Sequence, residues 1–225
     1  ELKNMHVAFD LGNVLLNVDL KIFERALDAQ LHEAGAKKQI DHPKLLIDSE
    51  TFLLRLQKPQ DLGMMDLAEG LAIYYPFLED TAIDALVKSW NQVVTPNEVM
   101  MNFVANLKDE GVKIAFLSNI GFTHLELLRK TLPELLRGSV EHMSCEVGAR
   151  KPSRLYYQSF LMDHADFIGG VYVDDLEANL KVGKQFRFKT FQFDLHAMMK
   201  ESLSIRKKEL DKIKSYIMNL KYVAK

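Results

Sequence analysis

Short apolar runs that end on a polar side chain constrain the fold of this chain more than any other sequence feature. Three of them stand before an acidic or hydroxyl residue: 5–9 before Asp10, 112–117 before Ser118, and 170–173 before Asp174. Runs of this length are typical of buried strands and too short for most helices. Segments with helical spacing separate the later runs, and alternation of strands with helices favours a parallel sheet covered by helices on both faces. The sequence therefore predicts an α/β fold.

The second half of the chain continues this alternation up to a basic tail. We expect further strands over 139–144 and 189–193, and helices over 97–109, 123–132, 155–162 and 177–184. The tail, residues 202–225, combines lysines with hydrophobic residues at helical spacing, which predicts an amphipathic helix packed on the core. Its apolar face would consist of Ile205, Leu210, Ile213, Ile217 and Leu220.

Residues 18–94 have a different pattern, because helical spacing dominates and strand candidates are few. Three prolines divide this block, and we expect about four helices in it. It follows directly on the first predicted strand, so we interpret it as an insertion. The predicted organisation is a core of residues 1–17 and 95–225 with an inserted helical subdomain of residues 18–94.

The composition excludes several classes of protein. Hydrophobic residues make up 48% of the 225 residues and charged residues 27%, which excludes a disordered or collagen-like chain. A net charge of −2 gives no overall attraction to nucleic acid or to anionic membranes. The single cysteine, Cys145, excludes an intramolecular disulfide, and we expect it to be buried and inert.

Neither a transmembrane stretch nor a signal-peptide pattern is visible in the sequence. We therefore expect a soluble, cytoplasmic protein without a nucleic-acid or membrane partner. A homodimer is compatible with the sequence but has no specific support in it.

Polar residues follow the predicted strands where the chemistry of an open parallel sheet is normally found. These are Asp10, Ser118, Asn119, Asp174 and Asp175, with Lys151 in a loop between them. Each could by itself be a turn former, a helix cap or a solvated charge. Together, three carboxylates in one crevice would repel one another, and a divalent cation such as Mg²⁺ would relieve that repulsion. A lysine and a hydroxyl beside the cation would suit a phosphate group, which Asp10 could attack.

Four segments, in this order, resemble the motifs of the haloacid dehalogenase-like (HAD) hydrolase superfamily. They are HVAFDLGNVL at 6–15, AFLSN at 115–119, GARKP at 148–152 and VYVDDLEANL at 171–180. The resemblance implies a Rossmann-like parallel sheet core, with residues 18–94 where this family inserts a cap. The sequence DLGN at 10–13 is similar to a bacterial branch that includes sugar-phosphate phosphatases, among them a glucose-1-phosphate phosphatase.

The resemblance implies a role for each matching residue. Asp10 would be the nucleophile and a metal ligand. Lys151, paired with Asp10, and Ser118 would act with it in catalysis. The phosphate ligands would be Asn13, Ser118, Asn119 and Lys151. Mg²⁺ would be held by Asp10, the backbone carbonyl of Gly12, Asp174 and Asp175, with Asn179 behind them. The implied function is a Mg²⁺-dependent phosphatase that hydrolyses a small phosphorylated metabolite, such as a sugar phosphate, through an aspartyl-phosphate.

One departure from the family pattern concerns the general acid. Typical phosphatases of the family carry a second Asp two residues after the nucleophile, where this chain has Gly12. General acid catalysis contributes about 10²–10⁴-fold to a rate. Three explanations stay open: Asn13, His6, a water or a cap residue replaces the acid; the leaving group needs little protonation; or turnover has been lost.

The glycine at the position of the general acid allows two alternative functions. The chain could be a catalytically impaired phosphate-binding or regulatory protein, or a hydrolase of the same family that is not a phosphatase. The cap would select the substrate, and its polar or aromatic candidates are His42, Arg55, Lys58, Tyr74, Tyr75 and Trp90. We expect His124 and His164 to be surface residues.

Overall fold

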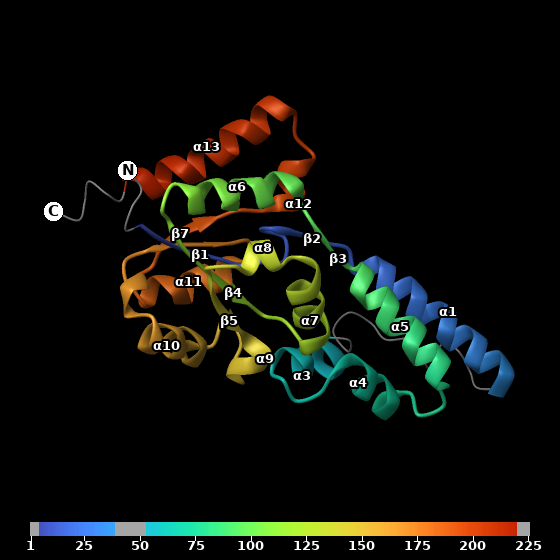
Figure 1. Cartoon of the computed structure of the whole chain (residues 1–225). Helices are drawn as coiled ribbons and strands as arrows, with labels where there is room; N and C mark the ends of the chain where they lie inside the picture. Colours follow the sequence, from blue (N-terminus) through green and yellow to red (C-terminus); the bar gives the residue numbers. More distant parts are fainter. Residues whose placement is uncertain (1–4, 39–52, 220–225) are drawn as a thin grey trace.

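A five-stranded parallel sheet forms the centre of the molecule in the computed structural model, which describes residues 5–38 and 53–219 (Figure 1). Its order is β5-β4-β1-β6-β7. The strands are β1 (His6–Phe9), β4 (Lys113–Ser118), β5 (Val140–Met143), β6 (Val171–Asp174) and β7 (Lys189–Gln192). Strand β1 pairs with β4 on one side, Phe9 opposite Phe116, and with β6 on the other, Phe9 opposite Val173. The predicted α/β class is confirmed.

The two faces of the sheet belong to different hydrophobic clusters, because successive side chains of a strand point in opposite directions. Val7 and Phe9 of β1 pack in one cluster, whereas Ala8 between them packs in the other. Burial on both faces explains why the strands appear in the sequence as continuous apolar runs.

Helices cover both faces (Figure 1). The cluster that contains Phe9 also receives residues from α6 (Glu98–Asp109), α7 (Phe122–Thr131), α8 (Pro133–Leu136), α12 (Leu195–Met199) and α13 (Leu203–Asn219). The opposite cluster receives residues from α10 (Arg154–Asp163), the 3₁₀ turn η3 (Ala165–Phe167) and α11 (Glu177–Gln185). A single turn, α9 (Ser144–Val147), follows β5.

The helical region of residues 20–38 and 53–92 has a hydrophobic cluster of its own, around Phe23, Leu71, Leu86 and Trp90. Its helices are α1 (Leu20–Lys38), the π-helix η2 (Leu53–Gln57), α3 (Lys58–Asp61), α4 (Leu67–Tyr74) and α5 (Asp80–Gln92). We call this region the cap; its expected limits, 18 and 94, stay a prediction. Helices α1 and α5 extend away from the sheet, whereas α3 lies beside α7 and α9 (Figure 1).

Two short strands that the sequence did not predict join the cap to the core. Strands β2 (Leu16–Val18) and β3 (Val94–Pro96) pair antiparallel, with Val18 opposite Val94. Three-residue strands of this kind leave no periodic signal in a sequence. Pro96 is therefore in a strand, and the next helix, α6, begins after Asn97, whose side chain accepts a hydrogen bond from the amide of Met100 (3.2 Å).

The predicted apolar face of the tail helix is only partly correct. Ile213 and Ile217 of α13 are fully buried against the core, and Leu210 packs at its edge. Ile205 is instead 40% exposed, near the start of the helix, and Leu220 lies outside the described residues. Helix α12 was not predicted.

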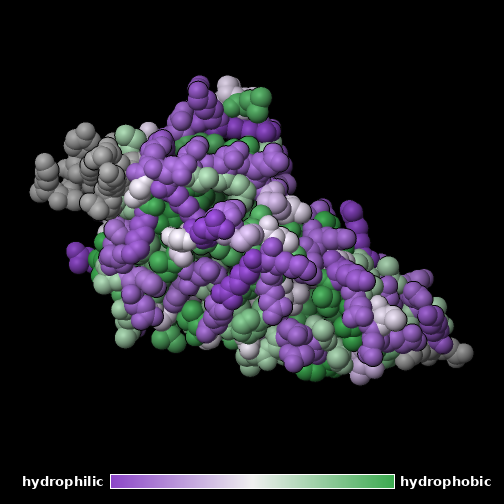
Figure 2. All heavy atoms as spheres, in the orientation of Figure 1, coloured by the Kyte–Doolittle hydropathy of each residue, from purple (hydrophilic) through white to green (hydrophobic). Residues whose placement is uncertain are grey.

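On the face drawn in Figure 2, hydrophilic residues predominate and hydrophobic residues lie in small patches between them. Among the described helices, none combines the length and the hydrophobicity needed to cross a membrane.

Candidate active site

The carboxyl ends of β1, β4 and β6 bring the predicted site residues together. From β1 the chain continues to β4 and β5 on one side of the sheet and then crosses over to β6 and β7 on the other. A crevice forms where the direction of the connections switches in this way, beside β1. Asp10 follows β1, Ser118 ends β4, and Asp174 ends β6. The order of the strands thus places three residues that are far apart in the sequence next to one another.

Lys151 is buried between two of these carboxylates. Its Nζ lies 3.0 Å from Asp10 Oδ1 and 2.7 Å from Asp174 Oδ2, and the residue is 2% exposed. Burial opposes the charged amine, but the two carboxylates outweigh it and raise the pKa of Lys151 above its ordinary range. Burial raises the pKa of Asp10 to about 7 in spite of Lys151. Lys151, Asp10 and Asp174 therefore form a buried cluster of three ionisable groups. Removing one of them would leave the charge of the others uncompensated.

Asp174 is fixed from several directions. Its carboxylate accepts hydrogen bonds from Lys151, the Tyr172 hydroxyl, the Asn179 amide (3.1 Å to each oxygen) and the Leu176 backbone amide (2.8 Å). Burial acts to raise the pKa of Asp174, but Lys151 and these hydrogen bonds keep it below its usual value. Asn179 thus contacts Asp174 as the resemblance implied.

Asp175 is the more accessible carboxylate of the adjacent pair. It is half-buried, and its Oδ2 accepts a hydrogen bond from the side chain of Asn13 (3.0 Å). Burial raises its pKa, while Asn13 acts in the opposite direction.

A divalent cation fits this group of acids. Asp10, Asp174 and Asp175 each offer a carboxylate oxygen, and the three oxygens lie within 4.8 Å of one another. A cluster made only of carboxylates suits a hard cation such as Mg²⁺ and would be electrostatically costly without one. The backbone carbonyl of Gly12, in the loop after Asp10, is the fourth predicted ligand, and its role stays a prediction.

Two asparagines of the predicted phosphate site are already engaged within the protein. Asn119 binds the main chain of Lys151 twice, accepting from its amide (2.7 Å) and donating to its carbonyl (2.9 Å). Asn13, in the left-handed conformation at φ 56°, donates to Asp175 and to Asp194 (3.1 Å) and accepts from the amide of His196 (2.9 Å). Both side chains position charged residues here; direct contact with phosphate stays a prediction for them.

A cavity of about 360 Å³ opens above the carboxylates, between core and cap. Asp10, Gly12, Ser118 and Asp175 line its floor, whereas Asp174 and Lys151 are buried behind it. The cap contributes three polar residues to the lining that were not among the predicted candidates: Gln57, Gln60 and Asp61. Nothing in the sequence marked them, because they fall in a short helical segment without clear periodicity.

The prediction for His124 was wrong. It is 8% exposed, lines the same cavity, and stacks on Trp90 of the cap with ring centroids 4.5 Å apart. Its Nε2 lies 2.7 Å from the Trp90 carbonyl oxygen, and burial lowers its pKa to about 4. Trp90 is the predicted cap candidate that lines the cavity; Arg55, Lys58, Tyr74 and Tyr75 do not, and His42 lies outside the described residues.

Cys145 and His164 match the expectations in different degrees. Cys145 is buried as predicted, and burial raises the pKa of its thiol to about 11, which disfavours the reactive thiolate. His164 is partly buried beside Phe160 and Phe167.

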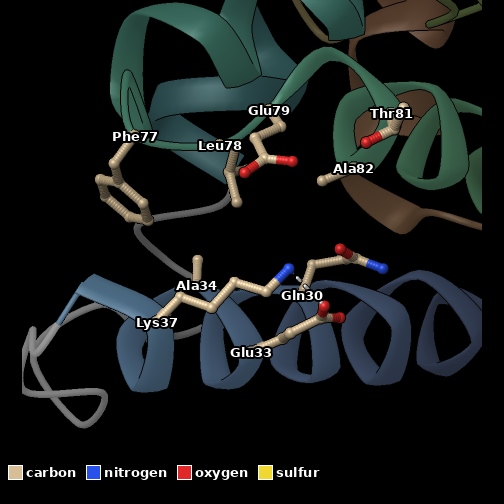
Figure 3. Close-up of a pocket in the computed structure, with 9 residues that line it drawn as sticks. All are labelled: Gln30, Glu33, Ala34, Lys37, Phe77, Leu78, Glu79, Thr81 and Ala82. Carbon is tan, nitrogen blue, oxygen red and sulfur yellow. Dashed lines mark ion pairs between the residues drawn. The ribbon is translucent and has the colours of Figure 1, made fainter.

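A second, smaller hollow of about 210 Å³ lies inside the cap, where α1 faces the segment that leads into α5 (Figure 3). Lys37 and Glu33 form an exposed ion pair there (2.8 Å) on α1, facing Glu79 across the gap. None of the predicted site residues lines it, and no cluster of catalytic side chains is found among its described residues. The site at the sheet edge is therefore the functional candidate.

Comparison with known proteins supports the fold. No protein-family model matches the sequence, and no curated protein does. Among solved structures, the magnesium complex of the HAD family enzyme BT-2542 from Bacteroides thetaiotaomicron has a TM-score of 0.66 at 18% identity, covering 85% of this chain and 93% of that chain. A HAD phosphatase from Thermococcus onnurineus has a TM-score of 0.60 at 17% identity, covering 84% and 85%.

An L-2-haloacid dehalogenase from Xanthobacter autotrophicus is also similar, with a TM-score of 0.52 at 15% identity and coverage of 88% of this chain and 82% of that chain. The chain therefore has the HAD fold that its four motifs predicted. Since phosphatases and dehalogenases share this fold, the fold does not by itself choose the reaction.

Proposed function

We propose that this protein is a Mg²⁺-dependent phosphatase that hydrolyses a small phosphorylated metabolite through an aspartyl-phosphate on Asp10. The observation that carries the proposal is the convergence of Asp10, Asp174 and Asp175 within 4.8 Å, backed by the buried Lys151. Mg²⁺ held by these acids would neutralise the negative charge of a phosphoryl group and of the nucleophile. Displacement of halide from carbon involves no phosphoryl oxygens, so it does not need a divalent cation beside the nucleophile.

In the proposed reaction, Lys151, Ser118 and Asp10 have different roles. Lys151, locked through its main chain by Asn119, holds the Asp10 carboxylate in one orientation. Ser118, at the end of β4, borders the cavity beside Asp10 and would donate its hydroxyl to a phosphoryl oxygen. The Asp10 carboxylate would then attack phosphorus, and the bond to the leaving oxygen would break. Water would subsequently hydrolyse the aspartyl-phosphate.

A solved structure with the same fold supports this assignment. BT-2542 has been crystallised in complex with magnesium and inorganic phosphate. The cavity of about 360 Å³ above Asp10 suits a small substrate, and its floor is polar while its walls include Trp90 and aliphatic side chains. We extend the proposal to a sugar phosphate or a metabolite of similar size.

The test is hydrolysis of a panel of sugar phosphates, acyl phosphates and nucleotides, with release of inorganic phosphate as the readout. We expect turnover with Mg²⁺, none with EDTA, and none with Asp10→Asn. Asp166→Asn is the matched control, because Asp166 is an exposed carboxylate in the η3 turn that pairs with Lys113. Thermal stabilisation by phosphate without turnover of any substrate would instead indicate a phosphate-binding protein. Release of halide from a haloacid without a metal would indicate a dehalogenase.

A further inference from the structure

Because residue 12 is a glycine, it cannot donate a proton to the leaving group of the substrate. Gly12 has no side chain, and a Cβ there would meet only Val18 Cγ2 at 3.4 Å, so the space above it is open. Two of the replacements considered from the sequence do not serve. His6 is at the other end of β1, where its Nε2 lies 3.2 Å from Asp166. Asn13 has an amide that is not acidic and is bound to Asp175 and Asp194.

Among the described cap residues, Asp61, the last residue of α3, is the carboxylate that borders the same cavity as Asp10, Gly12 and Ser118. Its side chain is 5% exposed, and its Oδ2 lies 2.9 Å from Nη2 of Arg150, the residue before Lys151. That oxygen accepts no well-aligned hydrogen bond from any described residue. A buried carboxylate that is paired with one cation and lines a cavity is a candidate for a functional group.

Two close contacts fix the position of Asp61 over the core. On one side, a Cβ on Gly121, at the start of α7, would lie 2.9 Å from Gln60 Cβ. On the other, a Cβ on Gly63 would lie 2.2 Å from the carbonyl oxygen of Cys145 in α9. Helix α3 therefore packs close to the start of α7 and to α9, beside which Figure 1 shows it. The backbone on either side of Asp61 is consequently held close to the core.

We propose that Asp61 is the general acid and base of this enzyme, in place of the side chain that Gly12 lacks. The proposal rests on the phosphatase function proposed above. In the first half-reaction, an Asp10 oxygen bonds to phosphorus, the phosphorus–oxygen bond of the ester breaks, and the carboxyl proton of Asp61 passes to the departing oxygen. In the second, water attacks the aspartyl-phosphate, gives its proton to the Asp61 carboxylate, and Asp10 leaves as carboxylate.

The electrostatic surroundings of Asp61 agree with this role. Burial raises its pKa to about 6, against the opposing influence of Arg150 and Lys151, and the neighbouring Cys145 thiol is neutral. A general acid is most effective when its pKa is near the working pH. His124, which lines the same cavity, is less suitable because burial lowers its pKa to about 4 and its Nε2 is bound to Trp90.

The dependence of the rate on the leaving group tests the proposal. An alkyl phosphate needs a proton on its departing oxygen, whereas p-nitrophenyl phosphate does not. We expect Asp61→Asn to lower kcat on the alkyl ester at least 100-fold and on p-nitrophenyl phosphate less than 5-fold. The fall of kcat/KM for the alkyl ester above pH 6 should also disappear in the variant. Asp84→Asn, an exposed carboxylate of α5, is the control and should match the wild type on both substrates.

Equal losses on the two substrates, or a raised KM with unchanged kcat, would overturn the proposal and assign Asp61 to substrate binding or to structure. Thermal melting of Asp61→Asn separates these results from a loss of folding. The phosphatase function is judged independently by Asp10→Asn: if that variant is inactive while Asp61→Asn shows no leaving-group dependence, only the role of Asp61 is wrong.

Discussion

Lys151 Nζ lies 2.7 Å from Asp174 Oδ2 in a position where neither group meets solvent. The same amine reaches Asp10 at 3.0 Å, so a single cation compensates two buried acids. The loop that carries it is closed by the two hydrogen bonds of Asn119. The charged groups of the site are thus positioned by contacts within the folded core itself.

Replacement of Lys151 by methionine should therefore affect stability as well as activity. Removing one partner of a buried ion pair costs about 3–5 kcal/mol, because the remaining charges are left uncompensated. We expect a loss of that order in the free energy of unfolding, measured by urea denaturation, together with loss of turnover. Lys113→Met removes an exposed pair with Asp166 and should cost less than about 1 kcal/mol. Similar losses in the two variants would contradict the role assigned to Lys151.

Metal binding should depend on Asp175. A ligand that binds only the folded state raises stability by about 2.7 kcal/mol at 100 times its Kd. We expect Mg²⁺ to raise the melting temperature of the wild type and of Asp166→Asn, and EDTA to reverse the rise. Asp175→Asn should lose most of it, because Asp175 is the half-buried acid of the cluster. An undiminished Mg²⁺ shift in Asp175→Asn would place the cation elsewhere.

Gly63 and Gly138 provide a matched pair for testing the contact between α3 and the core. Both have φ near 70°, so alanine costs roughly 1 kcal/mol of backbone strain at either position. Only at Gly63 would the new Cβ meet backbone, 2.2 Å from the Cys145 carbonyl oxygen, whereas at Gly138 nothing lies within 4 Å.

Gly63→Ala should therefore be the more destabilising of the two, by roughly a further 1–3 kcal/mol, and should displace Asp61. We expect it to lower the rate on alkyl esters, while Gly138→Ala keeps the wild-type rate. Equal stability and equal rates in the two variants would show that α3 does not rest on α9 in solution.

Burial of His124 should make stability fall in acid. Its pKa is about 4 in the folded protein, below the ordinary value of 6.5. Between these two pH values His124 is therefore protonated in the unfolded chain but neutral in the folded chain. The free energy of unfolding should fall as the pH drops from 6.5 to 4, by up to about 3 kcal/mol from this group. The raised pKa values of Asp61 and Asp10 act in the opposite direction, so the difference between variants is the informative quantity.

His124→Phe keeps an aromatic ring against Trp90 and removes the titration. Relative to the wild type, it should gain stability steadily as the pH falls through this window, as followed by urea denaturation. His196→Phe, at an exposed position, should show the wild-type profile. A constant difference between His124→Phe and the wild type from pH 7 to pH 4 would contradict the buried, neutral state of His124.

The sequence by itself determined the class of fold and the floor of the site. Strands that are buried on both faces are continuous apolar runs, so they can be recognised without their partners, and the residues that follow them meet at one edge of a parallel sheet. Asp10, Ser118, Asp174 and Asp175 were predictable for that reason. The resemblance placed Lys151 by its motif and implied its pairing with Asp10, whereas its second ion pair, with Asp174, was not predicted.

Only the tertiary structure decided what closes the site from above. Asp61 reaches the cavity because Gly63 and Gly121 allow α3 to approach the core closely, and such contacts between distant segments leave no periodic trace in the sequence. His124 looked like a surface residue because its covering partner, Trp90, comes from the cap. Local patterns report which face of an element is buried, whereas the partner that buries a polar side chain is fixed only when the two parts of the chain pack together.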